Sequence, residues 1–336
     1  MSDIYLKSQI PQELIEYFIP AEIGLEATPD EFVAKLVAVF REVKRVLRDD
    51  GTCWVNLGDT FAANRGYQVV DHKHKDVGNS FAMKAASFGV KPKCLIGIPW
   101  MTAFALRADG WYLRSDIIWA KGCSGDYKGG NVMPESVKDR PTRAHEYLFL
   151  LSKSERYFYD QNAINEPDQE SGERNMRSVW TVKTKPYSGA HFATFPEKLV
   201  EPCIMAGTSQ AGCCSECGKP YQRMIEKQGI TAHDGDTDSA YKKNSTANRL
   251  ALLRQAARER GEEYSNKTTT LGFEPDCTCN AKAVPCVVLD PFGGSGTVGA
   301  VAERLGRNSI LIELNPEYVV LAEQRTAQSG LLLEVA

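Results

Sequence analysis

The chain has 336 residues, of which 43% are hydrophobic, and its formal net charge at pH 7 is −3. This hydrophobic content suffices for a buried core in one large or two ordinary domains. No apolar run approaches the roughly 18 residues that a membrane-spanning helix needs, and the near-neutral charge gives no support for a strongly basic nucleic-acid binder.

The N-terminus does not resemble a signal peptide, because it carries acids at Asp3 and Glu13 and lacks a long apolar core. Ten cysteines in a chain without such a signal indicate reduced thiols or metal ligands rather than disulfides. We therefore expect a cytoplasmic protein with no membrane partner.

Helix and strand signals alternate along the first half of the chain. Thr28 and Glu31 form a capping box with Pro29 at the first helical position, and apolar residues follow at helical spacing. Further elements are predicted as strands at 52–57, 111–119, 146–151 and 157–160, the last two as a hairpin, and as a helix at 99–108. The alternation favours an α/β fold with a mostly parallel sheet covered by helices on both faces.

Two irregular stretches, at residues 62–91 and 122–143, interrupt this alternation and carry several lysines and arginines. Basic side chains there can meet DNA phosphates. For residues 62–91, a solvated loop is at least as good an interpretation.

Four cysteines have the spacing of a zinc site. They form two short-spaced pairs, Cys214 with Cys217 and Cys277 with Cys279, which can close a tetrahedral thiolate site, and Cys213 is an alternative to Cys214. Such a site would be structural, because four thiolates leave no open position for water. Unrelated buried thiols and a redox pair remain alternatives.

The most informative stretch of the chain is residues 286–315. A buried strand at 287–289 leads into a glycine loop and a helix, and a second strand at 310–312 ends at Glu313. Glycines let the backbone approach a ligand closely, and the helix N-terminus offers N–H groups. An acid at the tip of the next strand can accept hydrogen bonds from ribose hydroxyls. The stretch therefore predicts a site for a nucleoside-containing ligand.

A dinucleotide is one candidate ligand, because Gly294, Gly296 and Gly299 fit the pattern G-x-G-x-x-G. Residues 290–292, Asp-Pro-Phe, argue against it, because they stand where a pyrophosphate-binding turn would begin with glycine. Too few residues follow Gly299 for the rest of a doubly wound sheet, so the remaining strands must lie upstream.

In this order of motifs the chain resembles DNA amino-methyltransferases of the N4-cytosine/N6-adenine type, in the permuted class whose cofactor loop comes last. In that family the pattern Asp-Pro-Phe-x-Gly-x-Gly, here residues 290–296, holds S-adenosylmethionine. Residues 191–199 resemble the family's second cofactor motif. The resemblance assigns these residues to the cofactor: Asp290, Pro291, Phe292, Gly294, Gly296, Glu313, Asn315, Ala193, Thr194, Phe195 and Pro196.

The resemblance implies a Rossmann-like methyltransferase domain made of residues 1–208 and 284–336. Residues 209–283 would form a small Cys-rich, zinc-knuckle-like insert and a candidate for DNA recognition. The implied function is site-specific methylation of the exocyclic amine of cytosine (N4) or adenine (N6) in double-stranded DNA, after the base has flipped out of the stack. A cognate restriction enzyme is a further implied partner.

Residues 134–146 are similar to the family pattern Pro-Glu-Ser-x-x-Asp-Arg-Pro-x-x-x-His-Glu. This similarity makes Arg140, Arg143 and His145 candidates for contacts with DNA or with the target base. An internal ion pair between Asp139 and Arg140, and a structural role for His145, are the alternatives.

The family's catalytic motif, [Asp/Ser/Asn]-Pro-Pro-[aromatic], has no counterpart, because the sequence contains no Pro-Pro dipeptide. The catalytic residues are therefore unknown. Three explanations are open: a truncated chain whose catalytic strand is encoded upstream, a degenerate relative, or another group such as Asp59 in the catalytic role. Loss of the strand would leave an edge or gap in the sheet near the cofactor.

Other functions remain open on the sequence. They are methylation of RNA or protein, a non-catalytic module that binds cofactor or DNA, and a nicotinamide-dependent oxidoreductase. Methyl transfer to DNA, cofactor binding without transfer, and a preference for NAD would distinguish them.

Overall fold

The computed structural model describes residues 2–5, 23–24, 26–62, 90–122, 132, 135–168, 172–184, 195–227 and 268–333. The chain divides into two compact units. Unit 1 consists of Met1–Phe158, Ser178–Gly207 and Val287–Ala336, and unit 2 consists of Tyr159–Arg177 and Thr208–Cys286.

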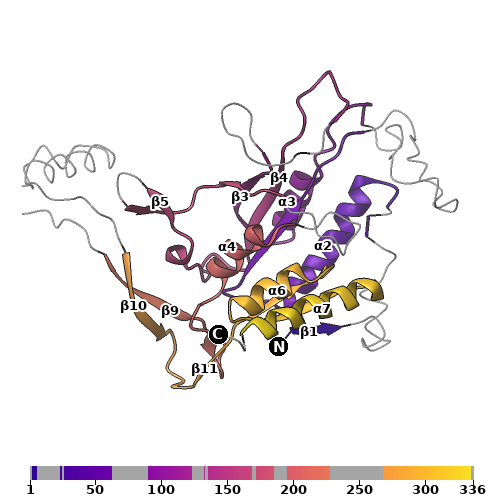
Figure 1. Ribbon diagram of the computed structural model, residues 1–336. Coiled ribbons are helices and arrows are strands. Elements are labelled where there is room, and N and C mark those ends of the chain that lie inside the picture. Colours follow the sequence, from indigo (N-terminus) through magenta and orange to yellow (C-terminus); the bar gives the residue numbers. More distant parts are fainter. Residues whose placement is uncertain are drawn as a thin grey trace, which may run out of the picture. The chain divides into compact units, whose positions relative to one another are not determined.

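Unit 1 alternates strands and helices (Figure 1). Its elements, in chain order, are β1 (Ser2–Tyr5), α2 (Pro29–Val46), β2 (Thr52–Leu57), α3 (Ile98–Ala108), β3 (Tyr112–Ala120), β4 (His145–Ser152), β7 (Val179–Thr181), α4 (Glu197–Gly207), β12 (Val287–Asp290), α6 (Thr297–Arg304), β13 (Asn308–Ile312) and α7 (Pro316–Leu333).

The strands of unit 1 form two sheets. One has the order β1-β13-β12, and all its pairings are parallel. The other has the order β2-β4-β3-β7, in which β4 runs antiparallel to β2 and β3, and β7 runs parallel to β3. Parallel pairing therefore prevails around the glycine loop, whereas the four-stranded sheet is antiparallel at its centre.

The predicted hairpin of 146–151 with 157–160 is wrong. Residues 157–160 form no strand, and β4 pairs with β2 and β3 instead. The reason is that the hydrogen-bonding edges of β4 are taken by these two strands, while Phe158 is buried and its N–H donates to the carbonyl of Asp50.

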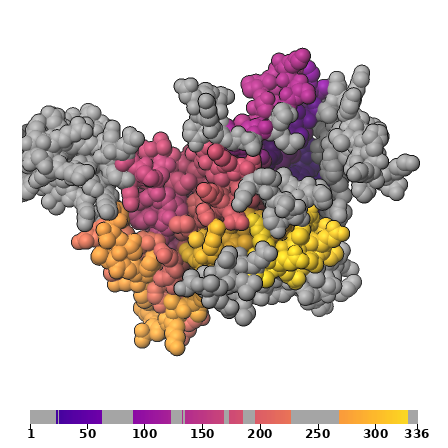
Figure 2. All heavy atoms as spheres, viewed as in Figure 1, coloured from indigo at the N-terminus to yellow at the C-terminus, as the bar shows by residue number. Residues whose placement is uncertain are grey.

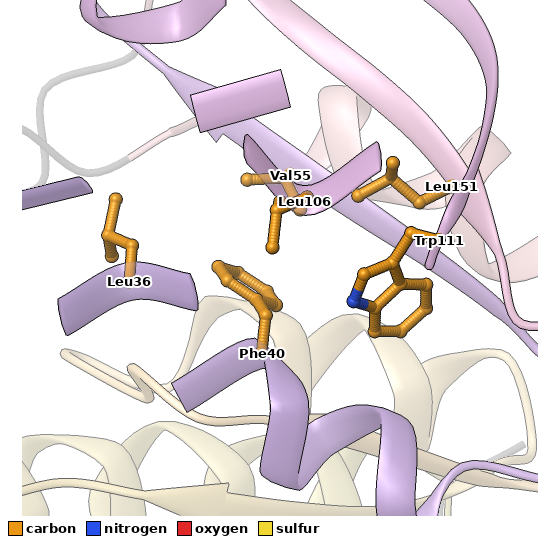
Figure 3. Close-up of a cluster of buried hydrophobic side chains, with 6 residues drawn as sticks. All are labelled: Leu36, Phe40, Val55, Leu106, Trp111 and Leu151. Atoms are coloured by element: carbon orange, nitrogen blue, oxygen red, sulfur yellow. The ribbon is translucent and has the colours of Figure 1, made fainter. Parts of the chain in front are cut away.

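Helix α2 packs on one face of the four-stranded sheet. It begins at the predicted capping box, where Thr28 Oγ1 accepts from the N–H of Glu31 at 3.1 Å. Apolar side chains then form the core between α2, α3 and the sheet. These residues, drawn in Figure 3, are Leu36, Phe40, Val55, Leu106, Trp111 and Leu151.

Helix α4 lies against the opposite face of β2. A Cβ added at Gly207 would lie 2.7 Å from Thr52 Oγ1, so the helix ends in close contact with the strand. On the same face the rings of Trp54 and Trp180 lie 6.2 Å apart between centroids. Helices therefore cover both faces of the sheet, as expected for this fold class.

Strands β2 and β12 are both edge strands of the described sheets. Cys53 lies on β2, near Asp290 on β12. Burial raises the pKa of the Cys53 thiol to about 12, and the negative charge of Asp290 adds to this rise. Phe40 of α2 also contacts Phe292 edge to face, with centroids 6.3 Å apart. The two edges therefore lie near each other within unit 1.

Unit 2 contains three antiparallel strand pairs among its described residues: β5 with β6, β8 with β11, and β9 with β10. Its elements are η3 (Gln161–Ala163), β5 (Glu166–Asp168), β6 (Gly172–Arg174), β8 (Cys213–Cys214), β9 (Tyr221–Lys227), β10 (Thr268–Pro275) and β11 (Ala283–Val284).

A buried ion pair joins residues 159–177 to the rest of unit 2. The guanidinium of Arg223 on β9 donates to both carboxylate oxygens of Asp160, at 3.1 and 2.9 Å from Nε. The two side chains are 11% and 4% exposed. This pair holds residues 159–177 in the same unit as residues 208–286.

Within the described part of the chain, no helix combines the length and the apolarity that a membrane crossing requires.

Candidate functional site

The glycine loop connects β12 to α6 and is held against the end of β13. The N–H of Gly293 donates to the carbonyl of Ile312 at 2.8 Å, and the N–H of Gly296 donates to the carbonyl of Gly293 at 2.9 Å. Gly296 is the N-cap of α6, and no side chain caps the helix there. The first-turn N–H groups of α6 thus follow directly on the loop, where an anionic or polar group can accept from them.

Glu313 closes the loop from the end of β13. Its Oε2 accepts from the N–H of Gly294 at 2.7 Å, and its Oε1 accepts from the N–H of Asn315 at 2.8 Å. Each carboxylate oxygen has a further lone pair, so both oxygens retain acceptor capacity for a ligand hydroxyl. The carboxylate therefore fixes the loop while still presenting acceptors.

Asp290 ends β12 beside Glu313. Its Oδ1 accepts from the N–H of Phe292 at 3.0 Å. Burial raises the pKa of Asp290 to about 6; the Phe292 N–H opposes this rise, and the negative charge of Glu313 adds to it. The structure thus brings the two acids together at the ends of adjacent parallel strands. Their combined negative charge favours a ligand that carries positive charge.

The glycines of the loop differ in what surrounds them. A Cβ at Gly293 would lie 3.0 Å from Leu311, and one at Gly296 would lie 2.9 Å from Ala322 of α7. At Gly294, with φ +50°, it would meet no atom nearer than 3.8 Å. The loop is therefore packed at Gly293 and Gly296 and open at Gly294. Parts of the C-terminal segment reach the viewed surface (yellow in Figure 2).

Arg325 of α7 ties the loop to α4 and was not identified from the sequence. Its guanidinium donates to Thr297 Oγ1 at 2.8 Å and to Glu197 Oε1 at 2.7 Å. Glu197 starts α4 and lies within residues 191–199, the predicted second cofactor motif. A single arginine in an 18-residue helix gives no sequence signal for this role, because both partners are distant in the chain.

The second cofactor motif is described only in part, because Ala193 and Thr194 lie outside the described residues. Phe195 is half-buried and packs against the apolar cluster that α4 and α6 share. Pro196 is buried, and its carbonyl accepts from the N–H of Leu199 at 2.9 Å. The described end of the motif thus adjoins the helix that begins at the glycine loop.

Two further residues assigned to the cofactor lie near the loop. Phe292 is 46% exposed although its ring contacts Phe40, and Pro291 is half-buried before it. Asn315, the last predicted cofactor residue, caps α7, because its Oδ1 accepts from the N–H of Glu317 at 2.9 Å. This contact gives the Asn315 side chain a structural role.

Arg140 is engaged within the protein. Its guanidinium forms an ion pair with Glu135 at 2.6 Å and lies 3.7 Å from the centroid of the Phe61 ring. The alternative pair with Asp139 does not form, because Asp139 pairs with Lys93 at 2.5 Å. Contact between Arg140 and DNA would have to compete with these partners.

The side chain of Asp59, the candidate replacement for the missing catalytic group, is only 2% exposed. Its Oδ1 accepts from the N–H groups of Gly97 and Ile98 at 2.9 and 3.1 Å, and its Oδ2 lies 3.7 Å from Arg143. The carboxylate caps the start of α3 and holds Arg143. These contacts give Asp59 a structural role.

His145 begins β4 and packs edge to face on Tyr147, with ring centroids 5.5 Å apart. Partial burial, followed by the positive charge of Arg143, lowers the pKa of His145. The imidazole is therefore neutral at pH 7, and it can exchange hydrogen bonds with a base edge without adding charge.

The four predicted metal ligands converge in unit 2. The Sγ atoms of Cys214, Cys217, Cys277 and Cys279 all lie within 4.8 Å of one another, and Cys213 is not in the group. Donation from the N–H groups of Cys217 and Glu216 lowers the pKa of the Cys214 thiol to about 7. The pKa of Cys279 is raised to about 12, chiefly by the neighbouring side chain of Cys217.

A matched pair of glycine substitutions tests the packed side of the loop. Gly296 and Gly306 have φ of +78° and +74°, so alanine at either position incurs left-handed strain of about 1–2 kcal/mol. Only at Gly296 would the new methyl also meet Ala322. In urea unfolding, Gly296→Ala should therefore lower the free energy of unfolding by about 1–3 kcal/mol more than Gly306→Ala does. Equal losses would contradict the packing of the loop on α7.

Comparison with known proteins links the two sequence segments of this site. A profile of the DNA methylase family matches residues 8–214 and 286–324. The gap in the match covers most of the cysteine-bearing part of unit 2. The two matched segments contain the glycine loop, Glu313 and the second cofactor motif.

Curated relatives are similar over most of the chain. The type II methyltransferase M.Cfr9I of Citrobacter freundii is 42% identical over 314 residues, which cover 93% of this chain and 77% of that protein. The type II methyltransferase M.SmaI of Serratia marcescens is 36% identical over 315 residues, which cover 93% of this chain and 80% of that protein.

Among solved structures, the PvuII DNA methyltransferase (cytosine-N4-specific) matches with a TM-score of 0.50 and 17% identity. The match covers 97% of this chain and 79% of that one. This likeness concerns the fold alone, and it confirms the predicted Rossmann-like α/β class.

Proposed function

This chain belongs to the N6/N4 DNA methylase family, and on that premise we propose that the loop of residues 290–296, closed by Glu313, is its S-adenosylmethionine site. The activity of the family is site-specific methylation of DNA on the N4 amine of cytosine or the N6 amine of adenine, with S-adenosylmethionine as the donor. The observation that carries the assignment is the interacting pair of carboxylates, Asp290 and Glu313.

The charge of these two acids distinguishes the candidate ligands. When bound, S-adenosylmethionine supplies a methyl group activated by a positively charged sulfur. A partly buried pair of carboxylates attracts such a cation, whereas it repels the pyrophosphate of a dinucleotide. The electrostatics therefore support the methyl donor over NAD.

Hydrogen bonds within the protein fix the position of the loop. Glu313 holds the N–H of Gly294 at 2.7 Å and still has acceptor capacity for the hydroxyls of a ribose. Because the open side of the loop is at Gly294, a nucleoside can approach the backbone there.

DNA is the substrate of the family, and the duplex shields the amine that receives the methyl group. The target base therefore flips out of the stack into the site. His145 and Arg143, at the start of β4, support contacts with the flipped base or the DNA backbone. Arg140 can contribute once it leaves Glu135. A cognate restriction enzyme is the expected cellular counterpart of a type II methyltransferase, and the cytoplasm is the expected compartment.

Methyl transfer also needs hydrogen-bond acceptors that hold the target amine in line with the methyl group, and none of the residues above has this role. The sequence lacks the Pro-Pro motif, and the contacts of Asp59 at the start of α3 favour a structural role for that residue. Within the described sheets β2 and β12 are edge strands, and a further strand that carries these acceptors can pair there beside the glycine loop. A separately encoded segment that carries the Pro-Pro motif would supply this strand.

The pH dependence of cofactor binding tests the carboxylate pair. Below about pH 6 Asp290 becomes protonated, so its attraction for a cation is lost and the affinity for S-adenosylmethionine should fall. Asp290→Asn should bind S-adenosylmethionine about tenfold more weakly, which is equivalent to about 1.4 kcal/mol. Its affinity should not fall further below pH 6, because asparagine does not titrate. Calorimetric titrations across the pH range measure both effects.

The matched control is Glu155→Gln, which removes an exposed carboxylate far along the chain from the loop and should bind like the wild type. A pH-independent wild-type affinity, an unchanged Asp290→Asn, or tighter binding of NAD would contradict the assignment.

The activity itself is tested with tritium-labelled S-adenosylmethionine and duplex DNA, followed by digestion to nucleosides. We expect N4-methylcytosine or N6-methyladenine, and no labelled RNA or protein. Adding a segment that carries the Pro-Pro motif tests whether a separately encoded strand supplies the acceptors for the target amine. Cofactor binding without transfer in either arrangement would instead indicate a non-catalytic relative.

A further inference from the structure

Unit 2 contains a second candidate site, independent of the glycine loop. We infer that Cys214, Cys217, Cys277 and Cys279 bind one zinc ion, and that this ion is a structural element of unit 2. The inference depends on the geometry of the four thiols and of the backbone around them.

The sulfur atoms are close to the spacing that zinc requires. Four ligands at a Zn–S distance of about 2.3 Å in a tetrahedron lie about 3.8 Å from one another. The four Sγ atoms already lie within 4.8 Å of one another. Ligation therefore needs only a small inward movement, although residues 218–276 separate the two pairs in the sequence.

The two cysteine pairs share two local backbone features, although their spacings differ. The residue after the second cysteine of each pair is left-handed: Gly218 has φ +71°, and Asn280 has φ +52°. In each pair the first sulfur accepts an N–H from two positions later, from Glu216 at Cys214 and from Cys279 at Cys277. Backbone N–H groups directed at sulfur stabilise thiolate ligands, so both turns suit a metal.

Backbone pairing holds the two turns together. Cys214 lies opposite Ala283 in the β8–β11 ladder, and the N–H of Ser215 donates to the carbonyl of Lys282 at 3.0 Å. The hydroxyl of Tyr221 also donates to the carbonyl of Ala281 at 3.2 Å. The convergence of the four thiols is therefore a consequence of strand register and does not depend on side-chain rotamers alone.

The ligand set indicates the metal and its role. Four thiolates in a tetrahedron are typical of zinc or of iron–sulfur chemistry, and a closed set of four leaves no position for water or substrate. The site is thus structural. Cys217 is exposed, so a chelator can reach it from solvent.

A metal has a clear function in this unit. The strand pairs that the structure describes in unit 2 are all two-stranded, and such pairs are at best marginally stable alone in water. β9 and β10 form one such pair (Figure 1). An ion that joins the two ends of residues 218–276 adds the free energy of ligation to folding.

Metal analysis of the purified full-length chain tests the inference. We expect about one zinc ion per chain, and its loss in Cys217→Ser and in Cys279→Ser, which alter the less buried members of the set. Cys213→Ser is the matched control, because Cys213 adjoins the site but lies outside the cluster, and it should keep its zinc. Replacing zinc with cobalt(II) should give the intense visible bands of tetrahedral thiolate coordination.

Chelation should increase proteolytic cleavage within unit 2 and leave S-adenosylmethionine affinity unchanged, so failure here is distinguishable from failure of the cofactor assignment. A chain with no zinc, bound iron, disulfides on alkylation mapping, or equal zinc in Cys217→Ser and Cys213→Ser would overturn the inference. Unchanged proteolysis after zinc removal would overturn the structural role.

Discussion

The Glu313 carboxylate is the contact on which the glycine loop depends. One oxygen holds the N–H of Gly294 and the other holds the N–H of Asn315, so a single side chain joins the loop after β12 to the segment that leads into α7. The N–H of Gly293 adds a bond to the end of β13. Without this carboxylate the loop would keep its backbone bonds but lose the contact that fixes Gly294 toward the ligand side.

The same arrangement buries the carboxyl group of Asp290 beside the half-buried Glu313. Burial disfavours the charge on Asp290, and Glu313 increases the repulsion, so the site is electrostatically unfavourable when empty. The N–H groups of Phe292, Gly294 and Asn315 offset part of that cost. Under the proposed assignment, the positive charge of S-adenosylmethionine offsets more of this cost, and the locally unfavourable arrangement gives affinity for a sulfonium nucleoside.

Local signals in the sequence were sufficient for much of this site. The strand, the glycine loop and the acid at the next strand tip follow one another closely, so their spacing alone predicts their proximity. The capping box at Thr28 is equally local, and it marks the start of α2. The cysteine pairs were recognisable by residue type and spacing.

Features that depend on distant partners were not predictable in the same way. The antiparallel placement of β4 between β2 and β3 depends on which edges are available in the fold, and a run of apolar residues does not encode that. The Asp160–Arg223 pair and the role of Arg325 each join residues far apart in the chain. Convergence of the cysteine pairs likewise required the register of β8 with β11.

The most direct test of the cofactor site is photochemical cross-linking of the full chain to methyl-labelled S-adenosylmethionine, followed by peptide mapping. We expect label on peptides that contain residues 290–296 or Glu313, and competition by unlabelled donor. Label on peptides of unit 2 alone, with no label on peptides that contain residues 290–296 or Glu313, would contradict the cofactor assignment.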